Sequence, residues 1–182
     1  MTETLDAILA SVQEIVPADL AAILSLEPDG TLRVLASSGP LSAPRLRRLK
    51  IDLASRPALR RALDSAGPTV LHSEAGEDTA EPDTYQGAVE LPGDHSCLVA
   101  PLRFEDTLEG LLTVDVAACG AFDAGQVKAI GALAAVAART IHEERRADGL
   151  ARQIDALAAR YAGLREDGQT GAALVGASPA WL

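Results

Sequence analysis

The residues of this sequence with the clearest capacity for chemistry are His95, Cys97 and Asp115. His95 and Cys97 lie two residues apart in a segment with the apolar pattern of a β-strand, so both side chains leave the same face. A polar turn separates this segment from a second apolar one. If the two form a hairpin centred near Glu105, Asp115 lies opposite His95 and Thr113 lies opposite Cys97. An imidazole, a thiolate and a carboxylate then meet on one patch of sheet, which predicts a metal site.

Each of these residues also has an ordinary structural interpretation. A single cysteine on a strand is usually a small buried hydrophobic residue, and a single histidine is more often a satisfied edge residue than a ligand. A shift of one residue in the hairpin register would move Asp115 to the opposite face of the sheet. His72, at the end of a predicted strand, could replace or join the ligands, although a solvated strand end is the simpler interpretation. His142 lies in a charged helical segment and is expected to be exposed.

Composition limits the classes of function. The chain has 182 residues, of which 48% are hydrophobic and only 3% are aromatic, so an aliphatic core is expected. The formal net charge is −10, and a basic patch at Arg45, Arg47, Arg48 and Lys50 is too short to hold a phosphate backbone. Direct binding of nucleic acid is therefore not expected. The sequence also lacks a Ser/His/Asp nucleophile elbow, a phosphate-binding glycine loop and the HExxH motif, so it is not expected to be an enzyme.

The cysteines and the N-terminus predict a reduced, cytoplasmic protein. Two cysteines, Cys97 and Cys119, do not make a disulfide framework. The first residues are acidic and lack the order of a signal peptide, and the alanine-rich stretch 130–141 is too short to span a membrane. Cys97 can therefore persist as a free thiol, as a metal ligand must.

Apolar periodicity predicts alternating helices and strands around one long polar segment. That segment, 73–93, ends directly before His95 and is expected to be a lid, a binding loop or disorder. A helix is expected from Pro57 to about Ser65, with Ser55 as its N-cap, and another is expected to begin at Asp123. The other predicted elements are a helix over 4–15 and strands over 20–26, 31–36, 69–71, 96–102 and 109–116.

The C-terminal part of the chain carries a short heptad pattern. Apolar residues follow at alternating spacings of three and four, over about two and a half heptads. The pattern fits either a helix packed on its own domain or a dimeric signalling helix, and its position beyond the last strand favours a homodimer. A linker is expected to follow, and Leu174–Leu182 has the character of the start of a further domain. The pattern comprises Ala147, Leu150, Ile154, Leu157, Tyr161 and Leu164.

This order of elements resembles a GAF sensor domain, an α/β fold with a central antiparallel sheet flanked by helices. The stretch Cys97-Leu-Val-Ala-Pro-Leu, followed by Leu108-Glu-Gly-Leu-Leu-Thr-Val-Asp, is similar to its final hairpin, and the resemblance covers about residues 4–142. The tail Leu-Val-Gly-Ala-Ser-Pro-Ala-Trp is similar to the opening of the AAA+ domain of sigma-54-dependent activators. The resemblance implies a sensor domain over 1–142, a helical, coiled-coil linker over 143–166, and a linker with the first residues of an AAA+ domain over 167–182.

Among these activators, His95-Ser-Cys97 and Thr113-Val-Asp115 resemble the nitric-oxide-sensing NorR family. That resemblance implies a mononuclear non-haem iron bound by His95, Cys97 and Asp115. A family Asp-x-Tyr-Asp-Gly pattern aligns with residues 83–87, which makes Asp83 a fourth implied ligand and places Gln86 where the family has a second carboxylate. A family arginine falls near Ala58, with Arg56 and Arg60 beside it.

The expected function is therefore a regulatory sensor that controls a downstream AAA+ ATPase, with nitric oxide as the signal at ferrous iron. A thiolate, an imidazole and carboxylates suit Fe(II) and leave a position open for a small ligand. Two alternatives remain open. The domain could bind an organic effector, or it could be a metal-free dimerisation or interaction module. Iron content in anaerobically purified protein discriminates between them.

Overall fold

The computed structural model of the chain describes residues 2–73, 85, 88–91, 95–117 and 122–172. Six strands form one antiparallel sheet in the order β3-β2-β1-β6-β5-β4, which confirms the expected α/β fold with a central antiparallel sheet. The strands are β1 (Leu20–Leu26), β2 (Thr31–Ser38), β3 (Lys50–Asp52), β4 (Thr69–Ser73), β5 (His95–Phe104) and β6 (Thr107–Val116). The α-helices are α1 (Thr2–Ile15), α2 (Pro57–Asp64) and α3 (Ala124–Ala172), with 3-10 helices η1 (Pro44–Arg48) and η2 (Leu53–Ser55).

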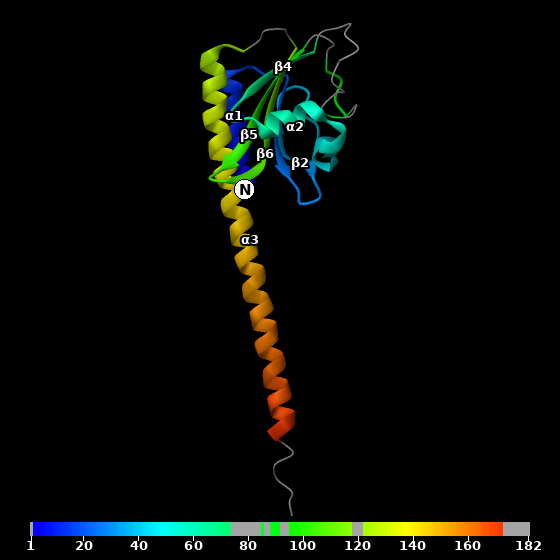
Figure 1. Cartoon of the computed structure of the whole chain (residues 1–182), viewed down its shortest axis with the longest axis vertical. Coiled ribbons are helices and arrows are strands. Elements are labelled where there is room, and N and C mark those ends of the chain that lie inside the picture. Colours follow the sequence, from blue (N-terminus) through cyan, green and yellow to red (C-terminus); the bar gives the residue numbers. More distant parts are fainter. Residues whose placement is uncertain (1, 74–84, 86–87, 92–94, 118–121, 173–182) are drawn as a thin grey trace, which may run out of the picture. The chain divides into compact units, whose positions relative to one another are not determined.

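The two faces of the sheet bury two separate apolar clusters. Helix α1 and the first part of α3 cover one face, and α2 lies over the other (Figure 1). Alternation along each strand divides its side chains between the clusters, so that Leu98 faces α1 and α3 whereas Cys97 and Val99 face the α2 side. The α2-side cluster also contains Tyr85. The predicted site residues Cys97 and Asp115 therefore belong to the side of the sheet that α2 covers.

Short polar motifs set the ends of two elements. The β1–β2 turn contains Gly30 at φ 80°, and Asp29 accepts hydrogen bonds from the backbone and side chain of Thr31. These hydrogen bonds lower the pKa of the exposed Asp29 carboxyl. At the start of α3, Asp123 accepts from the Gln126 backbone N–H and Gln126 accepts from that of Asp123. This reciprocal capping confirms that Asp123 caps the helix.

Helix α3 takes part in two compact units, Met1–His142 and Glu143–Leu182. In the first unit, Ile130 and Ile141 are buried in the sheet-facing cluster. In the second, Leu150, Ile154, Leu157 and Tyr161 are each more than half exposed in the isolated chain. The helix continues through Ala172, past the point where the sequence predicts a linker. None of the described helices is long and apolar enough to cross a membrane.

The β5–β6 hairpin corrects the predicted pairing of the site residues. Cys97 lies opposite Asp115, and Thr113 lies opposite Val99, two positions from the prediction. The hairpin turns at Glu105, which has a φ of 52°, and Asp106, and one extra residue enters β6 where the register shifts beside Leu102. Because the combined displacement is two residues, Asp115 stays on the face of Cys97.

The bulge in β6 also places an acidic side chain against α3. Glu109 is 1% exposed, and its Oε1 lies 2.7 Å from Nδ1 of His142. The His142 ring also lies against Phe104, with ring centroids 4.9 Å apart. The expectation that His142 is exposed was therefore wrong, because the helix turns this residue towards the bulged strand. His142 is the last residue of the first unit, so the contact ties β6 to α3 where that unit ends.

Candidate functional site

The candidate site centres on a buried pair of acidic groups in neighbouring strands. Cys97 in β5 and Asp115 in β6 are directly opposite each other and are 4% and 0% exposed. His95 begins β5, pairs with Ser73 of β4 and is partly buried. Two residues separate His95 from Cys97 in one strand, so the two side chains leave the same face. The strands thus bring all three predicted ligands to one face of the sheet.

Tyr85, which lies in the chain between β4 and β5, contacts this pair. Its side chain is fully buried, and its hydroxyl lies 2.7 Å from Thr113 Oγ1 and 3.0 Å from Asp115 Oδ2. In the sequence, Tyr85 stands out only as a position in a motif. A large aromatic residue within an otherwise polar segment is a signal that could have identified it as the anchor of that segment.

Burial and charge keep the Tyr85 hydroxyl protonated. Loss of solvation raises the pKa of Tyr85 well above its usual value, and the nearby Asp115 and Cys97 raise it further. The neutral phenol therefore donates its proton to Asp115 Oδ2. Since the phenol has one proton, the hydroxyl of Thr113 donates to the Tyr85 oxygen. The result is a buried chain of hydrogen bonds that fixes the carboxylate of Asp115.

Replacing Tyr85 by phenylalanine tests this hydrogen-bond chain. The metal-free Tyr85→Phe variant is expected to lose about 1–3 kcal/mol of unfolding free energy, because Asp115 and Thr113 stay buried without the phenol. Urea unfolding measures the change. Tyr161→Phe is the control, since Tyr161 is 68% exposed in the isolated chain and phenylalanine keeps its ring, so the free energy should be unchanged. Equal stability of the Tyr85→Phe and wild-type proteins would contradict the assigned role.

The described residues do not complete a metal site by themselves. Within the described ranges, no three His, Cys, Asp or Glu side chains lie close enough together to hold a metal ion. Asp83 and Gln86 lie outside the described residues, as does Cys119. His72 lies in β4 opposite Ser96. Cys97 and Asp115 are paired across β5 and β6, whereas the described residues His95, Cys97 and Asp115 do not form a group of three close donors.

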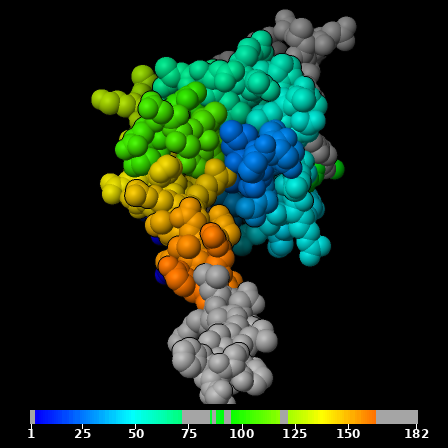
Figure 2. Space-filling view, turned by 60° about the horizontal axis from the view of Figure 1, so that its bottom comes forward, coloured from blue at the N-terminus to red at the C-terminus, as the bar shows by residue number. Residues whose placement is uncertain are grey.

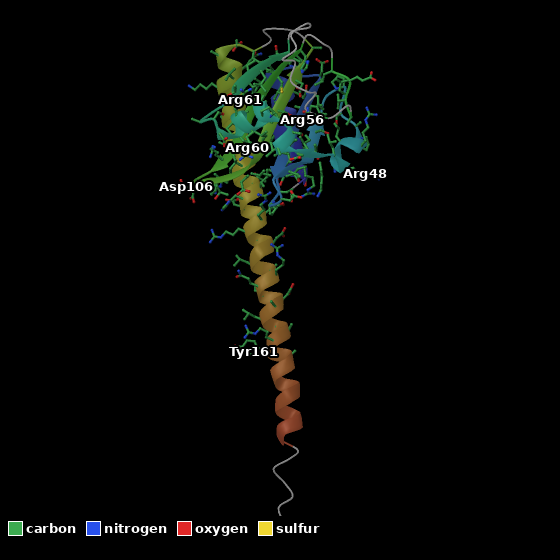
Figure 3. All side chains as sticks on the ribbon, turned by 45° about the vertical axis from the view of Figure 1, so that its right-hand side comes forward. Arg48, Arg56, Arg60, Arg61, Asp106 and Tyr161 are labelled. Atoms are coloured by element: carbon green, nitrogen blue, oxygen red, sulfur yellow. The ribbon has the colours of Figure 1, made fainter. Side chains whose placement is uncertain are left out.

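A second feature of the α2 side was missed from the sequence. Arg56, and not Ser55, is the N-cap of α2, and no side chain caps this helix. Ser55 instead ends η2 and its hydroxyl donates to the Asp52 carbonyl. Arg56 is 8% exposed, whereas Arg60, one turn further along the helix, is exposed. Figure 3 labels Arg56 together with Arg48, Arg60 and Arg61.

The comparison with protein families decides the identity of this fold. The sequence profile of the GAF domain family matches residues 1–142. The chain belongs to the GAF domain family. It is thus a sensor or regulatory domain, whose ligand and host protein the comparison leaves open. A comparison with curated protein sequences gives no match.

Solved structures of other GAF domains share the fold at low sequence identity. The GAF domain/HD domain protein from Geobacter sulfurreducens is 14% identical, with a TM-score of 0.66 over 79% of this chain and 93% of that one. The GAF domain of a phosphoenolpyruvate-protein phosphotransferase from Coxiella burnetii is 19% identical, with a TM-score of 0.66 over 81% and 86%. The GAF-B domain of DevS from Mycobacterium smegmatis is 20% identical, with a TM-score of 0.57 over 79% and 94%. At these identities the likeness shows the fold alone.

Proposed function

We propose that this GAF domain senses nitric oxide through a ferrous iron bound by His95, Cys97, Asp115 and Asp83. The observation that carries the proposal is the fully buried Asp115 directly opposite a buried cysteine that is not in a disulfide. Buried carboxylates are paired or bind metals, because an isolated charge is strongly disfavoured inside a protein.

The donor set fits iron in the types of its ligands. Thiolate, imidazole and carboxylate groups suit Fe(II), and His95 and Cys97 leave the same strand face as Asp115 does from the neighbouring strand. The set requires Asp83 as well, since the described residues do not reach three close donors. Ferrous iron would supply an open coordination position at which a diatomic ligand such as nitric oxide binds.

The surrounding residues orient the donors and exclude water. Tyr85 donates a hydrogen bond to Asp115 Oδ2. This bond fixes the orientation of the Asp115 carboxylate. Leu20 pairs with Asp115 from β1 and is fully buried, and Val99 lies next to Cys97 on the same strand face. This apolar lining suits an apolar diatomic signal, which needs access to the metal but few hydrogen bonds.

Strand β6 offers a direct route from the candidate site to the output helix. Asp115 and Thr113 lie near one end of the strand, and Glu109 near its other end contacts His142 of α3. A change at Asp115 would therefore be transmitted through a rigid strand to the last residue of the sensor unit. We propose that the helix beyond this residue forms a homodimer and carries the state of the sensor to a downstream domain.

The host protein that we propose is a cytoplasmic sigma-54-dependent activator. The support is the resemblance of the tail to the start of an AAA+ domain, a part of the chain outside the described residues. In such a protein the GAF domain restrains the ATPase until the signal arrives. A longer protein that includes the ATPase should gain constitutive ATPase activity when residues 1–160 are removed. Equal activity with and without those residues would disprove the restraint.

The affinity for ferrous iron tests whether the Asp115 carboxylate is a ligand. Anaerobic titration with ferrous iron should show an affinity at least about 100-fold lower for Asp115→Ala than for the wild type, because a ligand is lost. Asp106→Ala is the matched control, since Asp106 is exposed in the turn of the same hairpin (Figure 3). Equal affinity in the Asp115→Ala and Asp106→Ala variants would reject Asp115 as a ligand.

A metal-free interaction module is the second candidate, and one observation favours it. The Tyr85 ring is part of the α2-side apolar cluster, and its hydroxyl hydrogen-bonds Thr113 and Asp115 without a metal. If wild-type protein binds no ferrous iron, this interpretation, or that of a domain that binds an organic effector, replaces the gas sensor.

A further inference from the structure

The side chain of Arg56 is a buried cation without an anionic partner among the described residues. The residue is 8% exposed, and its Nε and Nη1 atoms are fully buried without a hydrogen-bond acceptor in the described part of the chain. Those two atoms carry three N–H bonds. Arginine does not lose its proton at any ordinary pH, so the positive charge cannot be removed by titration. A buried charge of this kind is strongly unfavourable until an anion accepts its hydrogen bonds.

Two further features make this position favourable for an anion. Arg56 is the N-cap of α2, an eight-residue helix whose first turn has no side-chain cap, so the positive end of the helix adds to the field of the guanidinium. The surrounding segment is basic although the chain is acidic. Between Pro44 and Arg61 it contains seven basic residues and a single acidic one, Asp52.

The basic segment forms part of the molecular surface. The residues around position 50, cyan in Figure 2, form a continuous area beside the blue β1–β2 hairpin. Arg47, Arg48, Lys50, Arg60 and Arg61 are exposed, so they would attract an anion from solution, whereas the buried Arg56 would bind it directly. The exposed charges would therefore attract the anion, and the enclosed guanidinium of Arg56 would recognise it.

We propose that Arg56 is the recognition residue of a second ligand site, which takes the oxoanion group of a small molecule, a carboxylate or a phosphate. Guanidinium groups bind both kinds of group through paired hydrogen bonds. Arg56 lies outside the proposed donor set of the iron site, so this ligand is distinct from nitric oxide. The domain would then respond to a small anionic metabolite in addition to the signal read at Cys97 and Asp115.

Thermal unfolding of the full 182-residue chain tests the proposal. The unfolding temperature is measured in potassium chloride, potassium phosphate and potassium acetate at equal ionic strength. The wild type should gain about 3–6 °C at ten times the dissociation constant of the preferred anion. Stabilisation by phosphate alone would identify a phosphate site, and stabilisation by acetate alone a carboxylate site.

Two variants of α2 remove the same charge from different environments. Arg60→Gln, exposed on the same helix, should keep the anion response, and Arg56→Gln should lose it. In chloride, Arg56→Gln should be at least as stable as the wild type, because it removes an uncompensated buried charge. Arg56→Lys keeps the charge but not the planar fork, so it should need at least tenfold more of the preferred anion for the same stabilisation.

Three results would overturn the proposal. They are no stabilisation of the wild type by either anion, equal stabilisation of both glutamine variants, and a large loss of stability of Arg56→Gln in chloride. The last would mean that a carboxylate of the chain itself already pairs with Arg56. Ferrous iron affinity is measured in parallel and should be unchanged in Arg56→Gln, so failure here is distinguishable from failure of the iron site.

Discussion

Alanine at position 110 is expected to destabilise the domain strongly. Gly110 lies in the β6 bulge at φ 156°, and a Cβ atom there would overlap the Leu24 carbonyl oxygen of the neighbouring strand β1. Backbone oxygen cannot move aside without breaking the β1–β6 pairing, which runs through Leu24 and Ser25. Steric overlap and backbone strain together should reduce the free energy of unfolding by more than about 3 kcal/mol, out of a typical 5–15 kcal/mol.

A second glycine separates the overlap from the backbone strain. Gly30 also has a positive φ, 80°, but a Cβ atom there would meet nothing within 4 Å. Gly30→Ala should therefore cost only about 1 kcal/mol. Chemical denaturation of both variants measures the difference. Similar losses in the two variants would show that the close approach of β1 to the bulge is not what requires glycine at position 110.

Glutamate in the exposed apolar stripe of α3 is expected to abolish the proposed dimer. Leu150, Ile154, Leu157 and Tyr161 are 52%, 65%, 52% and 68% exposed in the isolated chain, and their heptad spacing aligns them along one side of the helix. A glutamate at position 157 would bring two like charges together across a two-fold seam. The wild type should sediment as a dimer, and Leu157→Glu should sediment as a monomer at the same concentration.

The matched control places the same side chain on another face of the helix. Ala159 is exposed and lies off the seam, so Ala159→Glu should remain dimeric. Sedimentation of the wild type as a monomer at high micromolar concentration would contradict the dimer. Dissociation of both variants would indicate that overall negative charge, and not the seam, controls association.

Local patterns predicted the elements well because their signals are local. The helix over 4–15, the strand over 20–26 and the capping role of Asp123 each depend on residues a few positions apart. The long-range pairing of the hairpin was less accessible. The position of the turn and the residue added at the β6 bulge together moved Asp115 from His95 to Cys97, and neither feature has a strong sequence signal.

The predicted site also omitted residues whose importance depends on burial. Tyr85 and Arg56 contribute to the α2 side only because the fold encloses them, and no spacing rule connects either residue with Cys97. His142 was misjudged for the same reason, since its partner Glu109 lies in a strand far away in the sequence. Candidate residues that are close together in the sequence could be recognised. Residues that come into contact only through tertiary packing could not.

The iron content of anaerobically purified protein is the most direct test of the proposed sensor. The wild type should contain about one iron atom per chain when expressed with sufficient iron. Cys97→Ser should contain far less, because a hydroxyl is a much poorer anionic ligand than a thiolate at neutral pH. Cys119→Ser, which changes the other cysteine, should match the wild type. Iron-free wild-type protein, or equal iron in the Cys97→Ser variant, would contradict the account.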